Sequence, residues 1–250
     1  MDLDHALGAQ LVAEAPSLQR ARSRYKAKIA SVSPPAMRTQ FETEDACFLG
    51  VSLENAHFTR PKLEAMLEWV AKRFRRCTLL VGDSIHRITL ESTRGYGPQT
   101  ALREALALGD RFITHNDDLV GAFRNRILFR YETCSAVQRS ADYARYHAEL
   151  RTQFASDEAF RLSVQSFAQR YHRRTWDVVD EETRARRLER SCDYFLEEFA
   201  VFACLRRRGL GVMVYPGAFS TLEEIARGRH PDTCPELRGL TIVSLQIKRR

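Results

Sequence analysis

The sequence predicts an α/β protein: a single Rossmann-like domain with a parallel sheet and a long helical insertion. Short apolar runs at 46–53 and 77–83 have the pattern of buried strands, and the segment between them carries apolar residues at helical spacing. Two parallel strands joined by a helix form a βαβ unit. Further apolar runs follow at 211–215 and 240–247. This alternation predicts a doubly wound sheet that binds a ligand where its strands end.

The helix of the first unit has a recognisable start and one apolar face. Thr59 can cap its N-terminus, and Pro61 falls in its first turn, where proline is favoured. The apolar residues that follow at helical spacing are Leu63, Met66, Leu67, Val70 and Phe74. We therefore expect this helix to pack against the strand at 46–53.

The rest of the chain continues the alternation. The segment 94–98, which contains two glycines and a proline, ends the first unit. The elements expected after it are, in order, a helix at 99–124, a strand at 127–131, helices at 140–154, 157–174 and 181–207, a strand at 211–215 stopped by Pro216 and Gly217, and a strand at 240–247. Residues 1–43 are of mixed character and are expected to form a partly ordered N-terminal arm, with the Rossmann-like catalytic domain at 44–250.

Composition indicates a cytoplasmic protein. The chain has 250 residues, of which 44% are hydrophobic and 28% charged, as in an ordinary globular protein. It contains no apolar run of the roughly 20 residues that span a bilayer, and its first residues do not have the pattern of a secretory signal. The six cysteines are scattered without a C-x-x-C pair, which favours reduced, buried thiols over disulfides or a zinc site.

The charge balance indicates a polyanionic partner. The formal net charge is +7, and the basic residues occur in runs. These runs lie at 20–28, 170–174, 184–187, 206–208 and 248–250. Each run alone could be a solvated helix face, but together they favour a nucleic acid, since no amphipathic membrane anchor accompanies them.

Ser52 follows the first strand, where an α/β protein can hold either a nucleophile or a turn. The nucleophile elbow of serine hydrolases needs a glycine two residues after the serine, and Glu54 stands there. No glycine-rich dinucleotide motif and no P-loop is present, which argues against a nucleotide-dependent transferase. Ser52 alone leaves the choice open.

The helix expected at 181–207 carries a second candidate pair. Tyr194 and Glu198 lie one turn apart on a face that is otherwise apolar. Burying them is costly unless they have partners. They either satisfy each other or hold the amino group of a ligand and move its protons. Tyr215 poses the same choice, because it ends the fourth strand and points to the same sheet edge as Ser52.

These residues in this order resemble the cyclodipeptide synthases. The resemblance rests on Gly50-Val51-Ser52 with Asn55, on Tyr194-x-x-x-Glu198 and on Tyr215, and it covers residues 44–248. Trp69 and the pair Arg73-Phe74 fit the same pattern. Asn55 is typical of one subgroup of the family and Pro216 of the other. The resemblance implies a fold like the catalytic domain of class I tyrosyl- and tryptophanyl-tRNA synthetases.

The resemblance also implies a reaction. Such enzymes join the amino acids of two aminoacyl-tRNAs into a cyclic dipeptide, a diketopiperazine, and need no ATP, cofactor or metal. It implies that Ser52 forms the aminoacyl-enzyme. Tyr194 and Glu198 then hold the α-amino group with the help of Asn55, Glu198 accepts a proton, and Tyr215 relays protons when the ring closes. No matching histidine is present, so a ribose hydroxyl of the tRNA is the expected base for Ser52.

The same resemblance implies binding residues. The expected first pocket is lined by Gly50, Phe48, Leu80, Val201 and Met213. Arg173 and Arg174 are either part of an exposed basic turn or line the second pocket, where they would favour a polar or acidic side chain. Because the segment 99–124 is only weakly basic, tRNA contact is expected at Arg184, Arg186, Arg187, Arg206, Arg207 and Arg208. A non-catalytic tRNA-binding protein is the main alternative, yet it would have no reason to bury Glu198 beside Tyr194.

Overall fold

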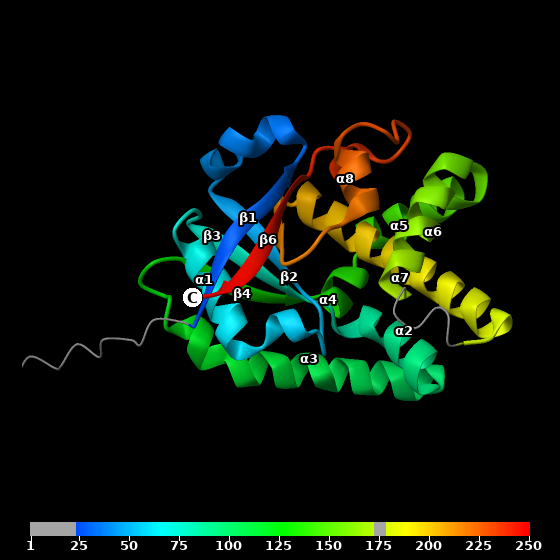
Figure 1. Ribbon diagram of the computed structural model, residues 1–250, viewed down its shortest axis with the longest axis horizontal. Coiled ribbons are helices and arrows are strands. Elements are labelled where there is room, and N and C mark those ends of the chain that lie inside the picture. Colours follow the sequence, from blue (N-terminus) through cyan, green and yellow to red (C-terminus); the bar gives the residue numbers. More distant parts are fainter. Residues whose placement is uncertain (1–23, 173–178) are drawn as a thin grey trace, which may run out of the picture.

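A computed structural model describes residues 24–172 and 179–250, and within them one sheet carries helices on both faces (Figure 1). Its strands are β1 (Tyr25–Ser33), β2 (Ala46–Val51), β3 (Arg76–Val81), β4 (Leu128–Thr133), β5 (Val212–Tyr215) and β6 (Thr241–Arg249). The helices are α1 (Arg60–Ala71), α2 (Asp83–Arg94), α3 (Pro98–Gly121), α4 (Cys134–Gln138), α5 (Ala141–Ser156), α6 (Glu158–His172), α7 (Glu181–Arg207), α8 (Ser220–Ala226) and α9 (Pro235–Arg238). Short 3-10 turns lie at Pro35–Thr39 (η1), Phe41–Thr43 (η2) and Ala56–Phe58 (η3).

The strand order is β1-β6-β5-β2-β3-β4, and the predicted doubly wound topology is confirmed. Strands β2 to β6 are parallel, whereas β1 pairs antiparallel with β6. The chain moves outward from β2 through β3 to β4 and then returns to the other side of β2 with β5 and β6. The crossover direction therefore reverses between β2 and β5, which is where folds of this type bind their ligands.

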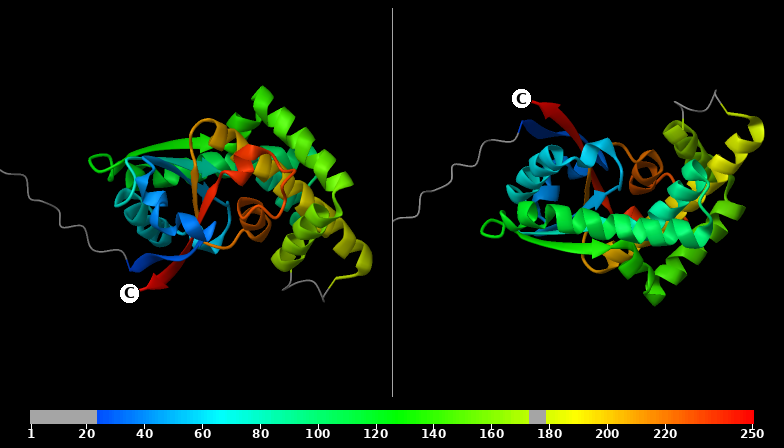
Figure 2. Two further views of the ribbon diagram at one scale, coloured as in Figure 1. Left: turned by 90° about the horizontal axis from the view of Figure 1, so that it is seen from above. Right: turned by 90° about the horizontal axis from the view of Figure 1, so that it is seen from below.

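Two apolar cores sandwich the sheet, as the alternation of side chains along β2 requires. Phe48 belongs to the core that the sheet forms with α5, α6, α7 and α8, while Leu49 belongs to the core on the side of α1. Figure 2 shows the two groups of helices on opposite sides of the sheet. Every residue of β2 is buried, which explains its continuous apolar sequence.

The helical insertion forms three helices before β5, as the sequence predicts. Side-chain caps set where two of them begin: the backbone N–H of Tyr143 donates to Ser140 Oγ (3.2 Å), and that of Thr183 donates to Asp180 Oδ1 (2.8 Å). Helix α7 then runs from Glu181 to Arg207 and crosses the sheet edge. No helix of the described residues has an apolar stretch long enough to cross a membrane.

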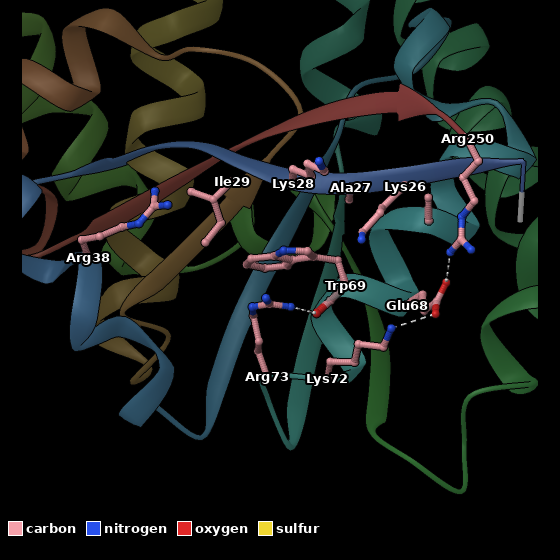
Figure 3. Close-up of a pocket in the computed structure, with 11 residues that line it drawn as sticks. Lys26, Ala27, Lys28, Ile29, Arg38, Glu68, Trp69, Lys72, Arg73 and Arg250 are labelled. Atoms are coloured by element: carbon pink, nitrogen blue, oxygen red, sulfur yellow. Dashed lines mark hydrogen bonds and ion pairs between the residues drawn. The ribbon is translucent and has the colours of Figure 1, made fainter.

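Strand β1, the helices α2, α4, α8 and α9 and the short 3-10 turns were not predicted. Strand β1 lies at 25–33, inside the segment that we expected as an arm, so the expected boundary at residue 44 does not coincide with an edge of the sheet. Residues 1–23 lie outside the described residues. Helix α2 begins directly after β3, where we expected only the end of a strand and a break. Side chains of β1 and α1 also line a separate groove (Figure 3).

Candidate active site

A cavity of about 360 Å³ lies where β2 and β5 end, between α2 and α7. Its lining includes the five residues that we predicted to be catalytic: Ser52, Asn55, Tyr194, Glu198 and Tyr215. Ser52 and Asn55 follow β2, and Tyr215 ends β5. Tyr194 and Glu198 lie on α7, more than a hundred residues after Ser52 in the sequence. The topology of the sheet is therefore what brings them together.

Ser52 and Tyr215 are joined directly. The Ser52 Oγ and the Tyr215 hydroxyl oxygen share a hydrogen bond of 2.8 Å, although 163 positions separate them in the chain. A Cβ atom at residue 50 would come within 3.3 Å of the Tyr215 ring, so glycine at this position lets the ring lie against β2. The tyrosine ring also packs against Phe219 at 4.5 Å and Phe58 at 5.9 Å between ring centroids. These contacts fix the hydroxyl that meets Ser52.

Glu198 is a buried carboxylic acid on the cavity wall. Its residue is 7% exposed, and burial raises the pKa of its carboxyl to about 8. It is therefore largely protonated at neutral pH, and a bound ammonium group would favour its ionised form. Tyr194 lines the same cavity one helical turn away. This pair can contact one ligand group, as its sequence spacing predicts.

The loop after Ser52 is held in an unusual conformation. Glu54 has φ of 55°, a left-handed geometry that costs a non-glycine residue about 1 kcal/mol. Its carboxylate binds His86 Nε2 (3.1 Å) and the guanidinium of Arg94, both on α2. Partial burial acts to raise the pKa of Glu54, but these two partners outweigh it and lower the pKa. The backbone N–H of His57 donates to Asn55 Oδ1 (2.9 Å), which fixes the Asn55 side chain.

One wall of the cavity is aromatic, and the sequence did not indicate it. Phe167 of α6 stacks on Phe195 of α7 at 4.3 Å and lies 5.9 Å from Phe219. All three line the cavity. In the sequence Phe195 has the pattern of an ordinary core residue, because helical periodicity cannot tell a core face from a cavity wall.

The residues that we expected to line the first pocket lie elsewhere. Phe48, Leu80, Val201 and Met213 are at most 2% exposed and belong to the core between the sheet and α7, and they are absent from the cavity lining. These apolar side chains pack against one another beneath the sheet edge, where the rings of Phe48 and Phe202 lie 5.5 Å apart between centroids. Their part in a first pocket stays a prediction. Arg173 and Arg174 lie outside the described residues.

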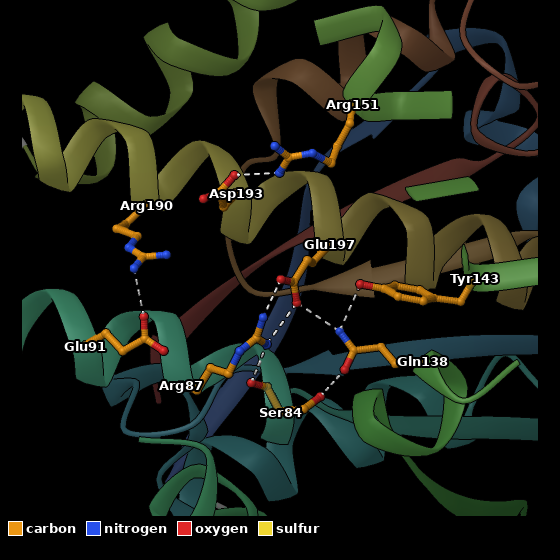
Figure 4. A network of polar contacts seen from close by, with 9 residues as sticks. All are labelled: Ser84, Arg87, Glu91, Gln138, Tyr143, Arg151, Arg190, Asp193 and Glu197. Carbon is orange, nitrogen blue, oxygen red and sulfur yellow. Dashed lines mark hydrogen bonds and ion pairs between the residues drawn. The ribbon is translucent and has the colours of Figure 1, made fainter. Parts of the chain in front are cut away.

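A polar network beside the cavity ties α2 to α7 (Figure 4). Glu197, the neighbour of Glu198, accepts two hydrogen bonds from Arg87 of α2 (3.0 and 2.5 Å) and one from Gln138 (3.0 Å). Ser84 donates to Gln138 Oε1, and Arg190 pairs with Glu91 at 3.4 Å. Burial acts to lower the pKa of Arg87, and Glu197 outweighs it. The network therefore holds together the two helices that border the cavity.

The predicted tRNA-binding arginines have different surroundings. Arg207 pairs with Asp142 (3.2 Å), and Arg208 pairs with Glu132 (2.6 Å). Arg186 and Arg187 line a separate pocket that shares Ser92 with the candidate active site. Within the described residues, no group of three or more His, Cys, Asp or Glu residues could hold a metal ion.

Fold and cavity together define a doubly wound α/β protein with a serine–tyrosine pair and a buried carboxylic acid at its switch point. Comparison with known families agrees: the cyclodipeptide synthase family profile matches residues 35–207, so the chain belongs to the cyclodipeptide synthase family. No curated protein matches the chain.

Solved structures share the fold at low sequence identity. A cyclodipeptide synthase from Fluoribacter dumoffii is 21% identical with a TM-score of 0.74, and the alignment covers 90% of this chain and 100% of that one. A Mycobacterium tuberculosis protein is 17% identical (TM-score 0.64, 92% and 95% covered), and its structure is described as relating such enzymes to type I tRNA synthetases. A cyclodipeptide synthase from Candidatus Glomeribacter gigasporarum, bound to Phe-tRNAPhe, is 17% identical (TM-score 0.61, 82% and 88% covered).

Proposed function

We propose that this cyclodipeptide synthase joins the amino acids of two aminoacyl-tRNAs in the cytoplasm through an aminoacyl-enzyme on Ser52. The observation that carries the proposal is the 2.8 Å hydrogen bond between Ser52 and Tyr215 in a cavity that also holds Glu198. Membership of the family supports the reaction type. A relative of the same fold that is bound to Phe-tRNAPhe supports the substrate class.

In the first step, Ser52 Oγ attacks the ester carbonyl carbon of an aminoacyl-tRNA. A new ester bond forms to Oγ, the bond to the terminal ribose oxygen breaks, and the ribose keeps the proton that Ser52 loses. A neighbouring ribose hydroxyl is the proposed base, since the ring of His86 is engaged by Glu54 (3.1 Å). Tyr215 holds Oγ in place through their shared hydrogen bond.

In the second step, the α-amino group of the bound residue attacks the ester of a second aminoacyl-tRNA. Glu198, assisted by Tyr194 and Asn55, holds this amino group and accepts the proton that it loses. A peptide bond forms, the ester bond to the second tRNA breaks, Glu198 passes the proton on to the ribose oxygen that leaves, and a dipeptidyl-enzyme remains on Ser52. Because burial raises the pKa of Glu198 to about 8, its carboxylate is a base of useful strength near neutral pH.

In the last step, the free amino group of the dipeptide attacks the ester carbonyl on Ser52. The six-membered ring closes, and the bond between carbonyl carbon and Oγ breaks. Tyr215 relays the proton from the amino group to Oγ, over the 2.8 Å that separates the two hydroxyl oxygens. The enzyme is then ready for another cycle without ATP, because the tRNA ester carries the activation.

The decisive experiment supplies the protein with a mixture of aminoacyl-tRNAs and searches for cyclic dipeptides by mass spectrometry. With one radiolabelled aminoacyl-tRNA, the wild type should retain acid-stable label, and Ser52→Ala should retain none and form no product. Normal product from Ser52→Ala would refute the covalent route. Binding of tRNA with no product from the wild type would favour the non-catalytic alternative.

The amino acids themselves are a separate part of the proposal. The aromatic wall of Phe167, Phe195 and Phe219 supports apolar side chains in one product position. The prediction of a polar or acidic partner rests on Arg173 and Arg174, which are not described. It is tested by whether Arg173→Ala and Arg174→Ala shift the product spectrum more than the total yield.

A further inference from the structure

The groove between β1 and α1 is lined by cationic side chains (Figure 3). It has a volume of about 490 Å³ and lies apart from the candidate active site. Its cations are Lys26, Lys28, Arg38, Lys72, Arg73 and Arg250. One carboxylate, that of Glu68, is among the lining residues. The groove is therefore strongly positive and suits an anionic ligand.

Half of these cations have protein partners. Arg73 donates to Glu42 (2.9 Å) and lies 4.3 Å above the Trp69 ring. Lys72 and Arg250 both pair with Glu68, at 2.9 and 3.7 Å. Their charge is thus partly neutralised.

The other half has no such partner in the part of the chain that the structure describes. Lys26, Lys28 and Arg38 are exposed and have no ion-pair partner among the residues that the structure describes. Among residues 24–172 and 179–250, no ion pair has to break before these three side chains bind an anion. They give the groove its uncompensated charge.

The cations are spread along the groove instead of surrounding one point. In Figure 3, Arg38 lies at one end and Arg250 at the other, with the two β1 lysines between them. Lys26 and Lys28 are alternate residues of one strand, so their Cα atoms lie about 7 Å apart along it. A row of separated cations matches a chain of phosphates better than it matches a single compact anion.

Protection of a sheet edge explains only part of this pattern. Strand β1 is an edge strand, and lysines on such strands prevent pairing with other chains. That accounts for Lys26 and Lys28. It does not account for Arg38, Lys72 and Arg250, which come from η1, the end of α1 and the C-terminus and line the same groove.

The groove and the candidate active site are linked by α1. This helix starts soon after Asn55, which lines the cavity, and it ends just before Lys72, which lines the groove. Its 12 residues extend over about 18 Å at 1.5 Å per residue. A few nucleotides of an RNA strand can span such a distance.

We propose that the β1–α1 groove binds the phosphate backbone of a tRNA whose aminoacyl end occupies the cavity. This inference rests on the proposed function, from which it takes the identity of the polyanion. It adds Lys26, Lys28 and Arg38 to the arginines of the runs 184–187 and 206–208, which we named as the expected tRNA contacts. Because backbone contacts are electrostatic, the interaction is salt-dependent and independent of base sequence.

The test is the affinity of fluorescently labelled, uncharged tRNA, measured by anisotropy at several salt concentrations. The triple variant Lys26→Glu, Lys28→Glu, Arg38→Glu should bind at least about tenfold more weakly, and the slope of log affinity against log salt should shrink by about 2. The matched control changes three exposed arginines elsewhere, Arg124→Glu, Arg139→Glu and Arg229→Glu, and carries the same net charge. It should lose much less affinity.

Separate outcomes judge the groove and the proposed function. Unchanged tRNA affinity in the groove variant, or an equal loss in the control, would overturn the groove assignment. Loss of binding to anionic phospholipid vesicles with intact tRNA affinity would overturn it in favour of a membrane surface. Failure of the wild type to make cyclic dipeptides would instead count against the proposed function, since uncharged tRNA tests the groove without catalysis.

Discussion

At the scale of single residues, the hydroxyl groups of Ser52 and Tyr215 depend on each other. Gly50 leaves room for the tyrosine ring, two phenylalanines hold it, and its hydroxyl ends 2.8 Å from Oγ. A serine without a histidine partner is a weak nucleophile unless its proton has somewhere to go. The Tyr215 hydroxyl is therefore suited to transfer protons to and from Ser52 Oγ when the ester bond forms and breaks.

Replacing Tyr215 by phenylalanine tests that route. The ring packing remains, so the fold should be unchanged, and the rate of cyclic dipeptide formation should fall about a hundredfold or more. If Tyr215 acts in ring closure, label on Ser52 should still form and then persist. Tyr143→Phe is the matched control, because that hydroxyl contacts Gln138 outside the cavity (3.2 Å). Equal activity of both variants would contradict the role of Tyr215.

Glu198 makes a prediction about stability and pH. In the unfolded chain its pKa is near 4.5, and in the folded protein burial raises it to about 8. The folded state therefore binds more protons between these values, and stability falls as pH rises from about 4.5 to about 8. Glu198→Gln abolishes this loss. Relative to wild type, the variant should gain a few kcal/mol between pH 5 and pH 8.5.

Urea unfolding at pH 5, 7 and 8.5 measures this difference. Glu189→Gln, an exposed position on the same helix, is the control and should not change the pH dependence. A parallel pH dependence for wild type and Glu198→Gln would show that Glu198 is ionised in the folded protein at neutral pH. The same Gln variant should lower product formation by about a hundredfold or more if Glu198 is the proposed base.

How much of the site the sequence predicts depends on the kind of residue. Ser52, Tyr194, Glu198 and Tyr215 could be named because polar groups stand out at strand ends and on an apolar helix face. The aromatic wall could not, since Phe167 looks the same in a core as beside a cavity. Phe48 shows the converse: it precedes the site in sequence, and its side chain packs in the core with α7.

At the scale of elements, α2 and α7 both border the cavity and are joined beside it. Neighbouring residues on each helix have different roles. His86 and Glu198 line the cavity, while Arg87 and Glu197 form an ion pair beside it. Strands β2 to β6 were predictable from their apolar runs. Helix α2 was not, because Asp83 and Ser84 look like the end of a strand when they are in fact buried in the first turn of a helix. Strand β1 was missed for a related reason, since its lysines give an edge strand a polar sequence.

Breaking the Arg87–Glu197 pair should be costly. Arg87→Met leaves a carboxylate that is 10% exposed without its main partner, and should lower the free energy of unfolding by about 3 kcal/mol. The double variant Arg87→Met, Glu197→Met should recover part of this loss, because no unpaired charge remains. Arg151→Met removes the exposed pair with Asp193 in the same region and should cost less than about 1 kcal/mol. Equal costs for Arg87→Met and Arg151→Met would contradict a bracing role for the buried pair.

At the scale of the whole molecule, the net charge is +7, and the basic runs differ in how far ion pairs within the protein neutralise them. Arg207 and Arg208 are engaged by Asp142 and Glu132, so much of their charge is used within the protein. Arg186 and Arg187 line a pocket that adjoins the candidate active site, and the β1–α1 groove adds further cations on another part of the surface. The sequence shows the basic runs but cannot show which of them are neutralised, since the partners lie far away in the chain.

This difference predicts which arginines contact tRNA. Arg186→Glu with Arg187→Glu should weaken tRNA binding and reduce the salt dependence by about 0.7–0.9 for each phosphate that the variant no longer neutralises. Arg207→Glu with Arg208→Glu changes the net charge equally, yet should act mainly on stability, because it places carboxylates beside Asp142 and Glu132. Anisotropy with labelled tRNA and urea unfolding of both variants separate the two effects. If the pair at 207 and 208 loses more tRNA affinity than the pair at 186 and 187, the tRNA approaches the C-terminal end of α7 and the ion pairs must open to admit it.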